Sequence, residues 1–341
     1  MERQSNIELC RLFAIASIVL MHSLGEYVIP GLGEAVRPAY WWMVASNSVG
    51  ILGVNTFLLI SGCFSVKSKK SAYTNLLYLC LFYLFVRIGI CVAMGVSIPS
   101  SIFMFVSKSS WFIPMYIGLL LLSPVLNCYI DKVDKRSMGL MTLIILVYDV
   151  WSDWYPGGIN ERSGFTIIHF MAMYFAGRYI GLHGVGKWVS RLAPIALLLL
   201  VSVISFLTFF IIRRGWNASI MLKFLANNSP LVIAAAIFLF LTFKGWHIRQ
   251  SKLINHCARS VLGVLLFHSW SMSQAFLAQH YHALYDNYHG VALFGLWMGS
   301  ILLTMAAGIA IDQIRIYTYD KIFSLASRCT TPHFSDKINN K

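Results

Sequence analysis

The sequence is poor in charged residues. Asp, Glu, Lys and Arg make up 12% of its 341 residues, against about 25% in typical soluble domains. Acidic residues are the scarcest charged class, with 13 Asp and Glu against 27 Lys and Arg, while 58% of the residues are hydrophobic. A soluble fold cannot bury so many apolar side chains, so the composition excludes a soluble globular domain and predicts a membrane protein.

Several sequence patterns of known chemistry are also missing. The seven cysteines lie in predicted membrane segments or on their predicted cytoplasmic side, so they indicate no disulfide framework. They lack the close paired spacing of a zinc site, and we expect no bound metal. The chain contains no GxSxG elbow, Walker loop, Rossmann fingerprint or repeat of fixed period. These absences exclude the common soluble catalytic scaffolds.

Long apolar runs are what the sequence has instead. A helix crosses a bilayer with about 20 apolar residues, and runs of that order recur along the whole chain. They predict an all-α, polytopic membrane protein with about ten transmembrane helices. The expected spans cover residues 7–24, 45–64, 74–96, 111–129, 139–152, 165–182, 194–212, 226–243, 260–278 and 292–314. We therefore expect one integral-membrane domain at residues 1–316 and a polar cytoplasmic tail at residues 317–341.

The distribution of Lys and Arg predicts the orientation, because short cytoplasmic loops carry an excess of these residues. With the N-terminus in the cytoplasm, few of them fall on the opposite side, and the C-terminus is then cytoplasmic too. The net charge of +14 requires no nucleic acid partner, because most of it lies in loops that face anionic lipid of the bilayer. The residues expected on the outer side are Arg37, Lys108, Arg162, Arg213, Arg214 and Lys223.

The first expected span carries ionisable residues inside an apolar run. Arg11 and His22 are eleven residues apart, which places them on one helix face, about 16 Å apart along the axis. Glu8 falls on the same face. Taken singly, Arg11 could extend to the lipid headgroups and His22 could be a hydrogen-bonded interior residue. Together on one stripe, the two residues favour a functional site.

Other polar residues also lie within the expected spans. Asn55 is compatible with a hydrogen bond to another helix or to a ligand. Arg87 falls near the middle of the bilayer, where it requires a partner or an aqueous cavity. His268 lies about two turns inside the ninth span, and Trp111 and Tyr116 belong to the fourth. Each of these residues is a candidate for substrate binding as well as for helix packing.

Three further features favour a structural interpretation. His169 lies near the outer end of the sixth span, where we expect a structural role. His280 and His282 form a His-x-His pattern in an expected outer loop, but without nearby Cys or acidic residues they predict a solvated loop rather than a metal site. Asp312 is expected to pair with Arg315, which lies one helical turn further on.

Four patches of the sequence together resemble a known family. The first is Arg11 followed by His22, the most specific of the four. The second is GVNTFLLISGCF (residues 53–64), and the third is WFIPMYIGLLLLSPVLN (residues 111–127). The fourth is the pair HFMAMYFAGRYIG (169–181) and SVLGVLLFHSW (260–270). In this order, and over nearly the whole chain, they are similar to the acyltransferase-3 family of bacterial integral-membrane acyltransferases.

The resemblance implies a ten-helix enzyme of the bacterial inner membrane. Such an enzyme takes an acyl group, usually acetyl, from acyl-CoA on the cytoplasmic side and transfers it to a hydroxyl of a cell-surface glycan or of its lipid-linked precursor. By position, Arg11 corresponds to the residue associated with the donor and His22 to the catalytic histidine. The family commonly has an Arg-rich patch after the second span, where this chain has Lys67-Ser68-Lys69-Lys70.

The chemistry of acyl transfer agrees with these residues. A protonated sugar hydroxyl is a poor nucleophile, and a histidine can serve as its general base near neutral pH. The phosphates of CoA require cations, which predicts donor binding by Arg11, Lys67 and Lys70, although lysines of this loop also suit lipid headgroups. Acetyl-CoA is then a co-substrate, and we expect no resident cofactor. The candidates for substrate binding or for stabilising the oxyanion are Glu8, Asn55, Arg87, Trp111, Tyr116 and His268.

The main alternative is a transporter or flippase for a glycan or a small solute, because intramembrane Arg and His also serve proton-coupled transport. Many transporters carry an internal duplication, and the sequence shows none. A membrane sensing module is a third hypothesis. The sequence leaves the acceptor glycan, the acyl group and the oligomeric state open.

Overall fold

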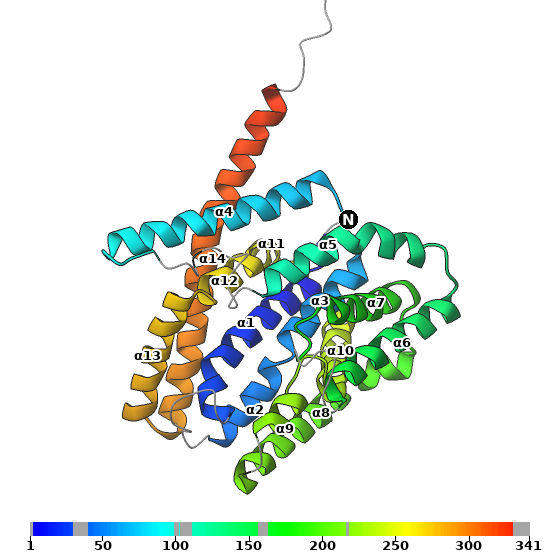
Figure 1. Cartoon of the computed structure of the whole chain (residues 1–341), viewed down its shortest axis with the longest axis horizontal. Helices are drawn as coiled ribbons and strands as arrows, with labels where there is room; N and C mark the ends of the chain where they lie inside the picture. Colours follow the sequence, from blue (N-terminus) through cyan, green and yellow to red (C-terminus); the bar gives the residue numbers. More distant parts are fainter. Residues whose placement is uncertain are drawn as a thin grey trace, which may run out of the picture.

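The computed structural model describes residues 3–29, 40–98, 102, 111–155, 163–215 and 218–329, with side chains through residue 322 (Figure 1). This part of the chain is helical and contains no β-strand, which confirms the predicted all-α class. The helices are α1 (Ser5–Val28), α2 (Trp41–Gly50), α3 (Gly53–Phe64), α4 (Lys70–Ala93), α5 (Phe112–Ile130), α6 (Lys135–Trp154), α7 (Ile167–His183), α8 (Lys187–Arg214), α9 (Ala218–Phe224), α10 (Pro230–Gly245), α11 (Lys252–Cys257), the short 3₁₀ turn η3 (Ala258–Ser260), α12 (Val261–His268), α13 (Ser271–Asn287) and α14 (Gly290–Cys329).

Not every helix is long enough to cross a bilayer. Among the described residues, six helices have the required length and apolar composition, or seven if the bent pair Lys252–His268 and Ser271–Asn287 counts as one span. The helices at the sixth and eighth expected spans, α7 and α10, are only 17 and 16 residues long. A multi-pass membrane protein is therefore supported, while the ten-span count and the cytoplasmic termini stay predictions.

The helix around which the molecule is arranged is α1. It packs against α2, α3, α10, α12 and α14, and Figure 1 shows it between these elements. Gly53 of α3 lies so close to the Ala14 carbonyl and the Ile18 side chain of α1 that a Cβ would have no room. Close approach at glycine also joins α3 to α7, where Gly62 meets the Tyr174 carbonyl. The small residues Gly53 and Gly62 therefore serve helix packing.

The ninth expected span, at residues 260–278, is the one that the structure corrects. The helix stops at His268 and restarts at Ser271, and the two parts meet at an angle of 83°. The cause is local, because Trp270 has an extended backbone (φ −70°, ψ 139°) that cannot continue the helix. The second part, α13, then runs to Asn287, so His280 and His282 lie on a helix and not in the expected loop.

The last helix, α14, is 40 residues long, and it extends past α4 and beyond the rest of the bundle (Figure 1). It continues through Tyr317, so the first part of the expected polar tail is helical. The rest of that tail, from residue 330, lies outside the described residues. The pair of Asp312 and Arg315 predicted on this helix is confirmed, with Arg315 Nε 2.7 Å from Asp312 Oδ1.

Candidate active site

Two histidines from opposite ends of the sequence meet inside the bundle. Nδ1 of His22 on α1 lies 2.9 Å from Nε2 of His268 at the end of α12. The ring of His268 is buried, with 1% of its surface exposed, whereas His22 keeps an exposed face. On its other side, His268 Nδ1 lies 2.8 Å from the backbone carbonyl of Val264. The two rings therefore form a chain of hydrogen bonds that starts at a backbone oxygen and ends at His22.

The contacts of this chain determine the tautomer of each neutral ring. The Val264 carbonyl can only accept, so the proton of His268 lies on Nδ1 and its Nε2 carries the lone pair. His22 must then donate its Nδ1–H to His268. The Nε2 atom of His22 is left with a lone pair, and no described residue bonds to it. His22 is thereby held in the form that can accept a proton.

The break after α12 places this pair at a helix C-terminus. His268 is the last residue of α12, where the partial negative charge of a helix C-terminus stabilises an imidazolium. The carbonyls freed by the break also need partners inside a membrane. Arg87 of α4 supplies one, because its Nη2 donates to the Leu266 carbonyl at 2.7 Å, and its guanidinium lies 5.7 Å from the Trp270 ring. The partner that we expected for Arg87 is thus a helix end.

A cavity of about 190 Å³ lies beside the histidine pair, and we call it the His22 cavity. Its volume is more than ten times the roughly 10–15 Å³ needed to hold one water, so it has room for a small polar molecule. Besides the two histidines, its lining includes Glu26, Tyr27, Gln274 and Tyr281. Glu26 follows His22 by four residues on the same face of α1. The cavity thus combines a base, a carboxylate and an amide with aromatic walls.

The aromatic walls are held in place from behind by Trp297 of α14. Its ring is fully buried, stacks on Tyr281 at 4.5 Å and meets the edge of Tyr27 at 5.1 Å. Its Nε1 donates to the Ser23 hydroxyl at 2.9 Å, and that hydroxyl donates in turn to the Leu20 carbonyl at 2.7 Å. The walls of the cavity are therefore packed before any ligand binds.

A second site lies around Arg11, about three turns before His22 on α1. Two adjoining cavities of about 310 and 410 Å³ share Lys67, Asn75, Arg259 and Arg315 among their lining residues, and we call them together the cationic cleft. Arg11 lines the first cavity, together with Tyr116 of α5, and pairs with Glu8 at 3.5 Å. Basic residues outnumber acids around the cleft, so it suits an anion with several charges. Its basic lining residues are Arg3, Arg11, Lys67, Lys69, Arg259 and Arg315.

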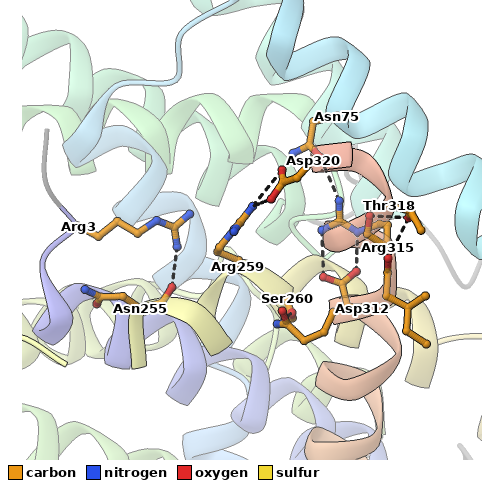
Figure 2. Close-up of polar contacts among 11 residues, drawn as sticks. Arg3, Asn75, Asn255, Arg259, Ser260, Asp312, Arg315, Thr318 and Asp320 are labelled. Carbon is orange, nitrogen blue, oxygen red and sulfur yellow. Dashed lines mark hydrogen bonds and ion pairs between the residues drawn. The ribbon is translucent and has the colours of Figure 1, made fainter. Parts of the chain in front are cut away.

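Polar contacts orient several of these cations (Figure 2). Asp312 holds Arg315 by two bonds of 2.7 and 3.0 Å, and a third nitrogen of Arg315 reaches Asn75 Oδ1 at 3.0 Å. Arg259 pairs with Asp320 of α14 at 3.1 Å. Fixed guanidinium groups of this kind match phosphate oxygens in geometry as well as in charge. Lys67 has no acidic partner among the described residues.

The cationic cleft and the His22 cavity have no lining residue in common. Ile15 and Ile18 lie between them on the shared face of α1, with 0% and 2% of their surfaces exposed. A ligand that reaches both sites, about 16 Å apart along the helix, must displace the side chains around Ile15.

The structure does not bring every predicted residue to these sites. Asn55 is buried and fully bonded: its Nδ2 donates to the Asn227 carbonyl at 2.7 Å, and its Oδ1 lies 2.7 Å from His169 Nε2. His169 Nδ1 lies 2.7 Å from Asp149 Oδ2. These three side chains form a sealed network (Asn55, Asp149 and His169) away from both cavities. Both polar atoms of the Asn55 amide are thus used within the bundle, and the bonds of His169 agree with the structural role that we expected.

Two other predicted residues also lie elsewhere. The Trp111 ring packs on Phe165 at 4.2 Å and lines neither cavity. Lys70 begins α4, and it is Lys69 that lines the cationic cleft. Arg87 supports the end of α12, as described above, without lining the His22 cavity.

Sequence reasoning missed several residues that line the sites. Glu26 was visible as the residue four places after His22, on the same stripe. Arg259, Arg315 and Gln274 carry no such signal, because only the packing of η3, α13 and α14 against α1 brings them to the sites. Among the described residues, no group of three or more His, Cys, Asp or Glu could hold a metal ion.

Comparison with known proteins gives one match. A family model described as an acyltransferase domain matches residues 4–313, which is nearly the whole chain. No curated protein and no solved structure matches.

Proposed function

The chain belongs to the acyltransferase-3 family, and on that premise we propose that it moves an acetyl or other short acyl group from acyl-CoA to a hydroxyl of a cell-surface glycan or its lipid-linked precursor. The family and the long apolar helices make the chain a multi-pass membrane acyltransferase. The donor, the acceptor and the roles of individual residues are the content of the proposal. So is its placement in a bacterial inner membrane, with the cationic cleft facing the cytoplasm.

The cationic cleft is the proposed binding site for the donor. CoA carries several phosphate charges, and the cleft offers Arg11, Lys67, Arg259 and Arg315 around one volume. Arginines can grip phosphate with two parallel hydrogen bonds. The acyl arm would then run along α1 past Ile15 to the His22 cavity, which requires the packing around Ile15 to open. Tyr116, beside Arg11 in the cleft, would contact the start of that arm.

His22 is the proposed general base. Its Nε2 removes the proton of the acceptor hydroxyl while the hydroxyl oxygen bonds to the thioester carbonyl carbon. The carbonyl oxygen becomes an oxyanion, and its collapse breaks the bond between carbon and sulfur. The thiolate that leaves takes the proton back from His22 Nε2. The products are an O-acyl ester and the free thiol of CoA, and both histidines end as they began.

His268 is the proposed positioning residue. Its Nε2 accepts the Nδ1–H of His22 at 2.9 Å, which holds the tautomer and stabilises the imidazolium formed during transfer. The helix end at α12 supports the same charge. For the oxyanion, the amide of Gln274 is the donor in the His22 cavity that has no partner among the described residues. Asn55, Arg87 and Trp111 lie too far outside the cavity for this role.

The observation that carries the proposal is the placement of both sites on one helix. Arg11 opens into a cleft built for an anion, and His22 presents a free lone pair to a separate cavity, on the same face of α1. A donor that is anionic at one end and reactive at the other matches that arrangement.

Two experiments test the function. Proteoliposomes that contain only this protein should release free thiol from acetyl-CoA, at a rate that rises with a suitable acceptor and is absent for His22→Ala. In cells, glycan mass spectrometry of a deletion strain should show the loss of one acyl mass.

The transporter hypothesis predicts a different outcome from the same proteoliposomes. The break between α12 and α13 is a feature that transporters also use at their binding sites. Uptake of a glycan or solute without thiol release would favour transport and contradict the acyltransferase proposal.

A further inference from the structure

We propose that Glu26 forms the acceptor subsite of the His22 cavity, with His282 as the residue that positions its carboxylate. In this subsite the Glu26 carboxylate accepts a hydrogen bond from a second hydroxyl of a pyranose ring, next to the hydroxyl that is acylated. The inference rests on the proposed function and adds which feature of the acceptor is read, and by which residues.

The first support is position. Glu26 follows His22 by one helical turn, so their side chains are neighbours on α1, and both line the same cavity. Adjacent hydroxyls of a sugar ring are likewise neighbours on one edge of the ring. A ring whose first hydroxyl meets Nε2 of His22 therefore brings its next hydroxyl toward Glu26.

The second support is the hydrogen-bonding capacity of the carboxylate. Oε2 of Glu26 lies 2.9 Å from Nε2 of His282 on α13, and a carboxylate only accepts, so His282 is the donor. Nδ1 of His282 is buried and has no partner among the described residues, which agrees with a neutral ring protonated on Nε2. The second oxygen of Glu26 has no partner there either. It is an acceptor held in place at the cavity wall, and it lacks a donor.

The third support is the chemistry of the possible donors. A protonated amine would also bind a carboxylate, but the negative charge would keep the amine protonated, and an ammonium has no lone pair to attack a thioester. A neutral hydroxyl donates to Glu26 without losing its reactivity. The walls of Tyr27 and Tyr281 add flat apolar surfaces, which suit the C–H face of a sugar ring. The arrangement therefore favours a neutral polyol over an amine or an anion.

The test uses the full chain in nanodiscs with acetyl-CoA and a panel of methyl glycosides, including glucoside, galactoside, mannoside, rhamnoside and glucosaminide. For the best acceptor, Glu26→Ala should raise the acceptor KM by about 10- to 150-fold, the range expected for a hydrogen bond to a charged group. His282→Gln should raise it less, because Glu26 remains. The acetyl-CoA KM should stay unchanged in both variants, because neither residue lines the cationic cleft.

His280→Gln is the matched control. His280 lies on the same helix, two residues away, bonds Ser300 Oγ at 2.8 Å and does not line the cavity, so the acceptor KM should equal that of the wild type. A deoxy glycoside that lacks the neighbouring hydroxyl completes the design. Its KM should be raised for the wild type, and Glu26→Ala should use it as well as the parent glycoside.

Several results would overturn the inference while leaving the proposed function in place. These are an unchanged acceptor KM in Glu26→Ala, a raised acetyl-CoA KM in that variant, a preference for the glucosaminide nitrogen, or hydrolysis of acetyl-CoA with no glycoside acylated. If the wild type consumed no acetyl-CoA at all, the proposed function itself would fail and this inference would fall with it.

Discussion

Two histidine networks in this molecule are each built from hydrogen-bonded side chains, but one faces a cavity and the other is fully buried. In the first, His22 is bonded on one nitrogen to His268 and turns the other to a cavity. In the second, His169 lies between Asp149 and Asn55 with both nitrogens bonded at 2.7 Å, and none of its surface is exposed. The second network has a carboxylate beside its histidine, as a catalytic triad does, whereas the first has a second histidine in that place.

The difference shows what makes a histidine available for chemistry. His169 has a carboxylate partner, but its second nitrogen is used by an amide, and it lines neither the His22 cavity nor the cationic cleft. His22 has a weaker partner and a free lone pair beside a space large enough for a substrate. Sealed contacts serve to hold α3, α6 and α7 together, because a buried polar group must keep its partners. The two networks therefore differ mainly in whether the histidine has a free nitrogen beside a cavity, and less in the residue types around it.

Removing the cavity-facing base should give the largest effect on turnover. We expect His22→Ala to lower the rate of acyl transfer by about 10²–10⁴-fold, the usual contribution of a general base. The helix should persist, since Ala is a good helix former. The measurement is thiol release at matched protein levels, with His280→Ala as the control. Near-normal turnover in His22→Ala would contradict the assignment of His22 as the general base, and with it the contrast to His169.

Changing the partner of that base should have an intermediate effect. His268→Ala removes the acceptor for the Nδ1–H of His22, a bond to a group that becomes charged during transfer, so we expect a loss of roughly 10- to 150-fold. His268→Gln can still accept this proton through its side-chain oxygen and should recover part of the rate. If both variants were as inactive as His22→Ala, the two histidines would act as one proton-carrying unit.

Arg11 and Arg87 show the same contrast between a residue that lines a cavity and one that is sealed, and we expect a smaller effect on acyl transfer here. Arg11 lines the cationic cleft, whereas Arg87 is sealed with 2% of its surface exposed. Arg11→Lys keeps the charge but loses the planar fork, so the KM for acetyl-CoA should rise by about tenfold, as for the loss of about 1.4 kcal/mol of binding, at a normal protein level. Arg87→Lys should leave that KM unchanged and lower the melting temperature. The reverse pattern would exchange the roles that we assign to the two residues.

The sealed network should have the smallest effect on turnover. His169→Leu leaves the carboxylate of Asp149 buried without its partner, which typically destabilises a protein by about 3–5 kcal/mol. We expect less protein in the membrane and a lower melting temperature, with an unchanged rate per folded molecule. Asp149→Asn, which removes the charge, should be milder. A rate loss in His169→Leu greater than the loss of folded protein would mean that this network takes part in the reaction.

Local sequence patterns predicted much of the fold. Apolar runs located most of the helices, and the stripe of Glu8, Arg11 and His22 follows from helical periodicity alone. The pair of Asp312 and Arg315 is likewise local, one turn apart. The break after His268 was not predicted, because residues 261–267 are apolar and no glycine or proline follows Gly263 in SVLGVLLFHSW to mark a stop.

The candidate site was harder to predict because it is assembled by packing between distant segments. His268 meets His22 across 246 positions of sequence, and only the seating of α12 on α1 determines that contact. Asn55 illustrates the converse, since no local pattern shows that its amide is taken by His169 and the Asn227 carbonyl. Spacing along one helix could identify half of the histidine pair, and tertiary contacts had to supply the other half.

The length of α14 has a further consequence. One continuous helix carries Trp297, which backs the His22 cavity, and Arg315, which lines the cationic cleft, and these residues are about 27 Å apart along its axis. A helix is stiff over that distance, so a small axial shift or rotation at one end also moves the other end. Donor and acceptor would then bind with mutual influence, each changing the affinity of the other by the same factor. In the proposed reaction, the long helix would thus couple the two substrate sites mechanically.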